Sequence, residues 1–110
     1  MAASQRTKGA AAEREVAQIL TDALGVVVKR KLGQARDGGD DISLGPFRLE
    51  VKRRETLAMD QWSHQVEAAA GANDIPVVIY RRSREPWRIS MLLEDWIVLV
   101  REEIAREDLS

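Results

Sequence analysis

The stretch from Asp41 to Lys52 constrains the fold of this chain more than any other. Apolar residues alternate with polar ones on both sides of Gly45-Pro46. Alternation with a period of two is typical of β-strands that bury one face. Gly45 can adopt a positive φ and Pro46 fixes its own φ, so the two residues favour a tight turn. The stretch therefore predicts a β-hairpin.

A two-residue turn also sets which residues face each other across the hairpin. Ile42 is then expected opposite Leu49. Asp41 falls opposite Glu50, with Cβ atoms about 4.5–5.5 Å apart. Two carboxylates in this position repel each other, and a divalent cation is an economical reason to hold them together. Lys52 follows Glu50 by two residues and therefore projects from the same face. The alternative is a charged side of the sheet that simply faces solvent.

The rest of the chain predicts further helices and strands around this hairpin. Helices are expected over residues 8–24, 58–72 and 93–107, and strands over residues 26–32, 75–80 and 87–92. Residues 1–7 are expected to form a loose N-terminal arm, and residues 33–40 a glycine-containing loop. The order is then αβββαββα, which indicates a single α/β domain over residues 1–110 with a mixed β-sheet flanked by helices. In the last helix the side chains expected to face the core are Leu93, Trp96, Leu99, Val100 and Ile104.

Length and composition limit the class of protein. A chain of 110 residues forms one domain with a modest core, and the absence of cysteine excludes disulfides and thiolate metal sites. No apolar run approaches the roughly 20 residues needed to span a bilayer. The N-terminus also lacks the apolar segment of a signal peptide, so we expect a cytoplasmic protein.

The net charge of −1 conceals an uneven distribution of charges. Lysine and arginine outnumber acidic residues over residues 1–36 and 76–91, whereas acidic residues dominate residues 92–110. Basic segments therefore flank the carboxylate hairpin, which fits a polyanion approaching one face of the molecule. A surface of merely mixed charge is the alternative.

Glu13 is an unusual member of the first expected helix. It lies three residues before Val16 and seven before Leu20, so it borders the apolar stripe of that helix. A carboxylate near the core needs a partner or a role. An ion pair with an arginine at the edge of the core would satisfy it, and so would a place in the carboxylate site.

The motifs of the chain, taken in order, resemble those of the PD-(D/E)XK nuclease superfamily. They are Lys8-Gly9-Ala-Ala-Ala-Glu13 on a helix, Gly39-Asp40-Asp41-Ile42 before the hairpin, Glu50-Val51-Lys52 on its second strand and a glutamine on the next helix. The first motif is similar to that of archaeal-type Holliday-junction resolvases, and small phage-encoded nucleases are also close. The resemblance covers residues 8 to 81 and implies a restriction-endonuclease-like core.

This resemblance implies a metal site. Asp41 and Glu50 would bind Mg²⁺, for which Mn²⁺ would substitute, and Val51 would offer its backbone carbonyl. Glu13 would complete the site from the first helix. Asp40 stands where the family often has proline, so either Asp40 or Asp41 could be the ligand; the register of the hairpin favours Asp41.

The resemblance also implies catalytic residues. Lys52 would orient or activate the attacking water and stabilise charge at the phosphate, and Gln65 would be the active-site glutamine of the second helix. Together with Glu13, Asp41 and Glu50, these residues suit phosphodiester hydrolysis, because a carboxylate-bound Mg²⁺ polarises the phosphate and lowers the pKa of its bound water.

The implied activity is that of a metal-dependent DNA endonuclease acting on branched or junction DNA, in recombination and repair or in phage DNA processing. Symmetric cutting of two strands calls for a homodimer. A DNA-binding accessory protein that keeps the fold without cutting is the alternative, and an interaction protein with solvated charges is another. The candidate phosphate contacts are Lys8, Lys29, Arg30, Lys31, Arg36, Arg53, Arg54, Arg81, Arg82 and Arg84.

Overall fold

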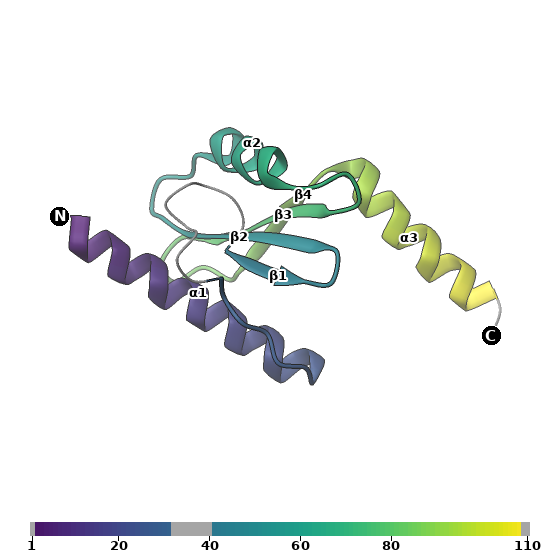
Figure 1. Cartoon of the computed structure of the whole chain (residues 1–110), viewed down its shortest axis with the longest axis horizontal. Coiled ribbons are helices and arrows are strands. Elements are labelled where there is room, and N and C mark those ends of the chain that lie inside the picture. The colour runs from purple at the N-terminus through teal and green to yellow at the C-terminus, as the bar shows by residue number, and fades with distance from the viewer. Residues whose placement is uncertain (1, 32–40, 109–110) are drawn as a thin grey trace.

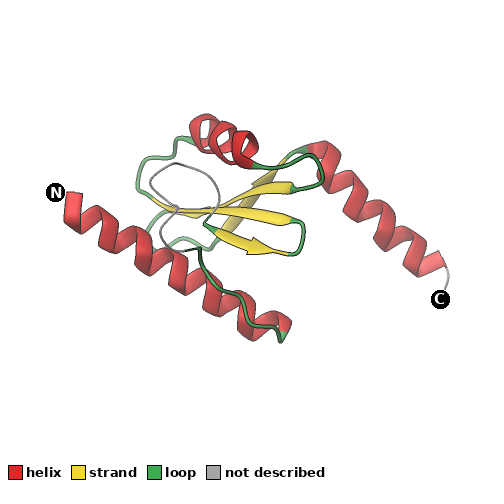
Figure 2. Cartoon of the chain, viewed as in Figure 1, coloured by secondary structure: helices red, strands yellow, loops and turns green. Residues whose placement is uncertain are grey.

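The structure is a computed structural model that describes residues 2–31 and 41–108, with side chains from residue 9 onward. It contains three helices and a four-stranded mixed sheet with strand order β1-β2-β3-β4 (Figures 1 and 2). The elements are α1 (Ala2–Leu24), β1 (Ile42–Leu44), β2 (Phe47–Arg53), α2 (Met59–Ala69), β3 (Ile75–Arg81), β4 (Arg88–Met91) and α3 (Leu93–Asp108). The expected α/β class is therefore confirmed.

The hairpin forms in the expected register. Ile42 pairs with Leu49, and Leu44 pairs with Phe47 across the turn. Gly45 adopts a φ of 56°, a value that a residue without a Cβ reaches at little cost. The ladder ends at Ile42, one pair short of the expected pairing of Asp41 with Glu50.

The tip of the hairpin is fastened to the start of β3. The carbonyl of Pro46 accepts the backbone N–H of Ile75 at 2.8 Å. Arg48 donates to the carbonyl of Gly45 at 2.6 Å and pairs with Asp74 at 3.1 Å. These contacts fix the hairpin of β1 and β2 relative to β3 within the sheet.

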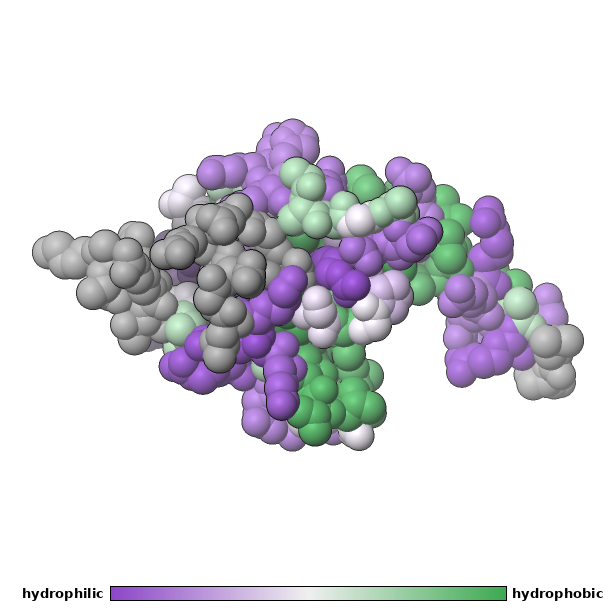
Figure 3. Space-filling view, in the orientation of Figure 1, coloured by the Kyte–Doolittle hydropathy of each residue, from purple (hydrophilic) through white to green (hydrophobic). Residues whose placement is uncertain are grey.

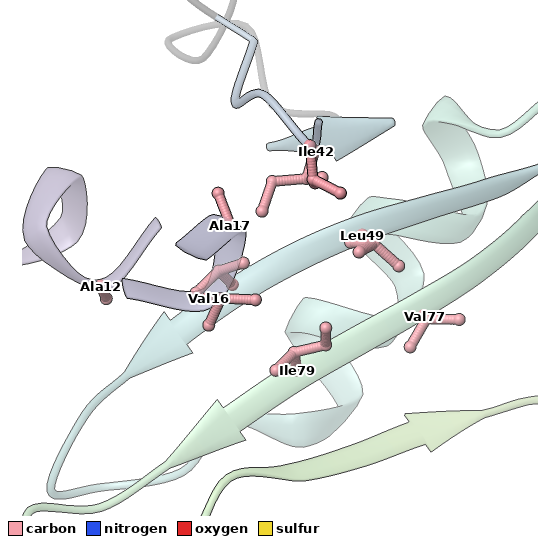
Figure 4. Packing of buried hydrophobic residues seen from close by; sticks show 9 residues of the cluster. Ala12, Val16, Ala17, Ile42, Leu49, Val77 and Ile79 are labelled. Atoms are coloured by element: carbon pink, nitrogen blue, oxygen red, sulfur yellow. The ribbon is translucent and has the colours of Figure 1, made fainter. Parts of the chain in front are cut away.

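The two central strands, β2 and β3, bury apolar side chains on both faces of the sheet. Leu49 and Val51 belong to a core cluster with Val16 of α1 and Ile42, part of which Figure 4 shows. Val78 of β3 packs instead with side chains of α2. The parallel pairing of β2 with β3 places α2 as the crossover between them, so α1 and α2 cover different faces.

The first helix is longer than the sequence predicted. It begins at Ala2, so residues 2–7 continue the helix and are not the loose arm that we expected. The run Ala2-Ala-Ser-Gln-Arg contains several strong helix formers and neither glycine nor proline, so nothing in it breaks the helix.

The strand expected over residues 26–32 is wrong over its described part. Only Arg30 forms a β-bridge, to Ile42, and Lys31 donates its N–H to the carbonyl of Asp41. Because β1 is only three residues long, it offers a short edge for pairing. Val28 bonds instead to the hydroxyl of Thr21 on α1 at 3.0 Å. Leu32 and the expected loop 33–40 lie outside the described residues.

The last helix does not close the core. No residue of α3 is buried, and the helix projects away from the sheet at the end of the molecule far from α1 (Figure 1). Trp96 is 50% exposed and Ile104 53%, so the expected inward orientation of these side chains is wrong. An apolar stripe in the sequence predicts that a face is covered, but not by which molecule.

Candidate active site

One acidic and one basic side chain of the hairpin, Glu50 and Lys52, project from the face of the sheet that α2 covers. Glu50 lies beside Val78 in the parallel register, and Lys52 lies beside Tyr80. Val78 and Tyr80 both belong to the apolar cluster under α2. Neighbouring residues of paired strands point to the same face, so Glu50 and Lys52 share that face.

Asp41 is fixed in place by the backbone of the neighbouring strand. Its carboxylate accepts the N–H of Val51 at 2.7 Å, and its own N–H donates to the carbonyl of Leu49 at 2.6 Å. The side chain is 7% exposed. A buried carboxylate that accepts a backbone N–H is held in one orientation, which brings its charge close to Glu50.

Glu50 is the most perturbed acid of the site. It is only 3% exposed, and its Oε2 atom is buried with no hydrogen-bond partner within the described residues. Burial, followed by the charge of Asp41 and a hydrogen bond with it, raises the pKa of Glu50 to about 8. Lys52 acts in the opposite direction on this pKa, with its Nζ 3.9 Å from Oε1 of Glu50.

Glu13 approaches this group from α1. Burial and the charge of Asp41 raise the pKa of Glu13, while the charges of Arg30 and Lys52 oppose the rise. Its Oε1 lies 3.6 Å from Nη1 of Arg30, which also donates to the carbonyl of Ala10. The alternative considered from the sequence, an ion pair with an arginine at the edge of the core, is therefore the arrangement observed.

The Asp41–Glu50 pair fits a divalent cation. Oxygen is the ligand atom that Mg²⁺ prefers, and a cation would supply the partner that Oε2 of Glu50 lacks. Among residues 2–31 and 41–108, however, no three His, Cys, Asp or Glu side chains are grouped as a metal ion would require. The two hairpin acids are thus together, whereas Glu13 is held towards Arg30.

The remaining predicted site residues have these positions. Val51, expected as a carbonyl ligand, uses its N–H to hold Asp41. Gln65 lies half-buried on α2, the helix on the same face as Glu50. His64 is exposed, as expected from the sequence. Asp40, the alternative ligand to Asp41, lies outside the described residues.

The candidate phosphate contacts are not equivalent. Arg81 stacks over Trp87 at 4.9 Å and pairs with Glu15 at 3.4 Å, so its guanidinium serves contacts within the protein. Arg82 donates to the backbone carbonyl of Glu55. Arg53 is half-buried, while the exposed members of the set are Lys29, Lys31, Arg54, Arg82 and Arg84. The side chains of Lys8 and Arg36 lie outside the description.

A cavity of about 390 Å³ reveals residues that the sequence did not assign to the site. It lies between α1 and residues 28–30, and its cationic lining residues are Arg14, Lys29 and Arg30. Gln18 and Thr21 line it from the same helix as Arg14. The signal was present in the sequence as the i, i+4, i+7 spacing of Arg14, Gln18 and Thr21, which places all three on one side of a helix.

Comparison with known proteins gives one match. Residues 4–108 match a family described as "Phage putative PDDEXK endonuclease". The small α/β architecture with its mixed sheet is consistent with the restriction-endonuclease-like fold. No curated protein and no solved structure was found to match the chain. Over the described residues, no helix combines the length and apolarity that a membrane crossing requires.

Proposed function

Because the chain belongs to this family of phage PDDEXK endonucleases, we propose that it is a Mg²⁺-dependent DNA endonuclease that hydrolyses phosphodiester bonds. The observation that carries the proposal is the state of Glu50, buried beside Asp41 with a raised pKa and with an oxygen that has no hydrogen-bond partner in the described part of the chain. Such strong perturbation of a carboxylate is typical of functional sites. A fold that needed only stability would gain nothing from burying this charge next to another.

Asp41 and Glu50 would hold the ion, with the carbonyl of Val51 as a third protein ligand and Glu13 as a further acid. When bound, Mg²⁺ would polarise the phosphate and make a coordinated water more acidic. Mn²⁺ would serve in its place.

Lys52 would act on the water and on the phosphate. Its ammonium lies beside Glu50, so it can donate to a water near that carboxylate or to a phosphate oxygen that gains negative charge. Gln65, on the helix covering this face, would help to orient that water. These groups position and stabilise, which is what phosphodiester hydrolysis requires of a protein.

The DNA backbone would lie across the cationic surface beside α1. Arg14, Lys29 and Arg30 line the cavity next to Glu13, and a phosphate there would neutralise them. Such contacts position the DNA without reading its sequence. The preferred substrate would be branched or junction DNA, processed in the cytoplasm of a bacterium or phage-infected cell. Paired cuts would require a homodimer.

The decisive experiment is cleavage of supercoiled plasmid and of a four-way junction with Mg²⁺. Glu50→Gln and Lys52→Ala should each lower the cleavage rate by about 100-fold or more, because each removes a group from the reacting centre. Glu102→Gln, an equal change on the exposed face of α3, should cleave as the wild type does.

Two results would contradict the proposal. Wild-type protein that binds these DNAs but never nicks them with Mg²⁺ or Mn²⁺ would favour a non-cleaving accessory protein. Cleavage that survives in both Glu50→Gln and Lys52→Ala would place the reaction elsewhere in the chain.

A further inference from the structure

The helix α3 carries an apolar surface that is left uncovered in the described part of the chain. None of its 16 residues is buried, and Leu93 is 68% exposed. On the edge strand β4, which precedes α3 in the chain, Ile89 is 61% exposed. A second apolar surface lies at the end of α1, where Ile19, Leu24, Val26 and Val27 are exposed; it is the green patch at the lower centre of Figure 3. Apolar side chains gathered in this way mark an interaction surface.

The apolar side chains of α3 form one continuous stripe. Leu93, Ile97, Val100 and Ile104 follow one another at intervals of four, three and four residues, which places them on one side of a helix. Trp96 borders the stripe and is half exposed. The stripe covers the helix from Leu93 to Ile104, about 17 Å at roughly 1.5 Å per residue.

The charged side chains beside this stripe favour a partner with complementary charges. Glu94 and Arg101 are two helical turns apart on the same flank. If a second α3 lies antiparallel on the first, Leu93 faces Ile104 and Ile97 faces Val100. The same alignment brings Glu94 of one copy next to Arg101 of the other, twice across the two-fold axis. The helix is therefore complementary in shape and charge to itself.

We propose that α3 is the surface through which two copies of this chain associate, as an antiparallel helix pair about a two-fold axis. This inference rests on the proposed homodimer and names its interface. The pair lies at the end of the molecule away from α1, so it does not cover the helix that carries Glu13 (Figure 1). Two active sites would then face away from a shared central pair of helices.

The test is the mass of the full chain in solution, measured by sedimentation equilibrium. Wild type should be a dimer that dissociates on dilution. Ile97→Asp should be monomeric at the same concentration, with the circular dichroism of the wild type, because Ile97 is 39% exposed and is not a member of either buried cluster. Glu50→Gln should remain dimeric, which separates this result from any result on cleavage.

A charge exchange tests the antiparallel alignment itself. Glu94→Arg or Arg101→Glu alone should raise the dimer dissociation constant by about tenfold, since each change turns two attractive contacts into two repulsive ones. The double variant Glu94→Arg/Arg101→Glu should return to the wild-type value. Glu102→Arg makes the same charge change as Glu94→Arg on the opposite side of the helix and should have little effect.

Several outcomes would overturn the proposal. A wild type that is monomeric at high concentration would do so, because the stripe would then need a different molecule. Assemblies larger than a dimer would indicate contact between α3 and the second apolar surface on α1. A dimer unaffected by Ile97→Asp, or a double variant no tighter than the single ones, would remove α3 from the interface.

Discussion

Glu50 is a buried acid whose surroundings disfavour its charged form. It is almost fully buried, it lies beside a second carboxylate, and the ammonium of Lys52 is 3.9 Å away. Burial and Asp41 together favour the protonated form of Glu50 at neutral pH in the absence of metal. A bound cation would reverse this preference, so the binding of metal should release a proton.

The raised pKa predicts how stability depends on pH. The pKa of Glu50 rises from 4.5 to about 8 on folding, so the folded protein holds this proton more tightly than the unfolded chain. The metal-free protein should therefore lose stability as the pH rises from about 4.5 through 8. We expect its Tm to fall by roughly 5 °C or more over this range, which corresponds to about 1 kcal/mol or more in a domain of this size.

Glu50→Gln is the matched variant, because its amide keeps the shape and carries no charge. Differential scanning calorimetry from about pH 5 to about pH 8.5 should show that this variant lacks most of the fall. Addition of Mg²⁺ to the wild type at the upper end should restore the lost stability. Parallel curves for both proteins would show that Glu50 does not carry the effect.

At the same scale, the sequence predicted the hairpin acids well because the evidence was local. A two-residue turn and a period of two suffice to place Asp41 near Glu50. The partner of Glu13 could not be predicted from local sequence in this way. Whether it meets Arg30 or a metal depends on how α1 lies against the sheet, and that depends on packing between segments far apart in the chain.

Among the elements, α1 and the β3–β4 pair are joined by a polar cluster at their edge. Trp87 donates from Nε1 to Glu15 at 3.0 Å, and Arg81 pairs with the same carboxylate while stacking on the indole. The hydrogen bond from Trp87 is the main reason that the pKa of Glu15 is lowered. The cluster joins the first helix to the far side of the sheet, so it supports the helix that carries Glu13.

Glu15→Ala should therefore destabilise the protein by about 1 kcal/mol, since it removes the acceptor for Trp87 and the partner of Arg81. Chemical denaturation at pH 7 measures the change. Asp22→Ala is the control, because Asp22 accepts a hydrogen bond only from Gln18 on its own helix among the contacts described. Equal effects of the two substitutions would show that the cluster does not join α1 to the sheet.

Elements that depend on a distant neighbour were the hardest to predict. Residues 26–31 have the composition of a strand, but the only adjoining strand edge is three residues long. The apolar stripe of α3 predicted a helix face packed against the core, yet nothing within the described chain covers that face. Periodicity identifies which face is apolar, whereas the covering surface is a property of the tertiary or quaternary structure.

The molecule as a whole is elongated. Its extents are 53 × 28 × 27 Å and its radius of gyration is 14.8 Å, compared with about 13 Å for a compact domain of this length. The projecting α3 accounts for much of this shape (Figure 2). The sheet with α1 and α2 therefore forms the folded unit, and α3 is attached to its edge.

A chain that ends after Leu92 should fold. The two apolar clusters contain no residue of α3, so the truncated chain keeps every buried side chain of the described core. We expect a cooperative thermal transition, with a Tm within about 5 °C of that of the dilute full chain, or about 1 kcal/mol. Circular dichroism on heating measures this. A truncated chain without a cooperative transition would show that α3 is part of the folding unit.

The fastened tip of the hairpin has a consequence for how this sequence can change. Because the carbonyl of Pro46 is bonded to Ile75, the strands cannot shift to absorb a length difference. One residue inserted between Ile42 and the turn would rotate Asp41 to the opposite face and separate it from Glu50. The site can therefore tolerate substitutions of neighbouring side chains far better than insertions or deletions. Natural variants of this hairpin should differ by substitutions and keep the same number of residues.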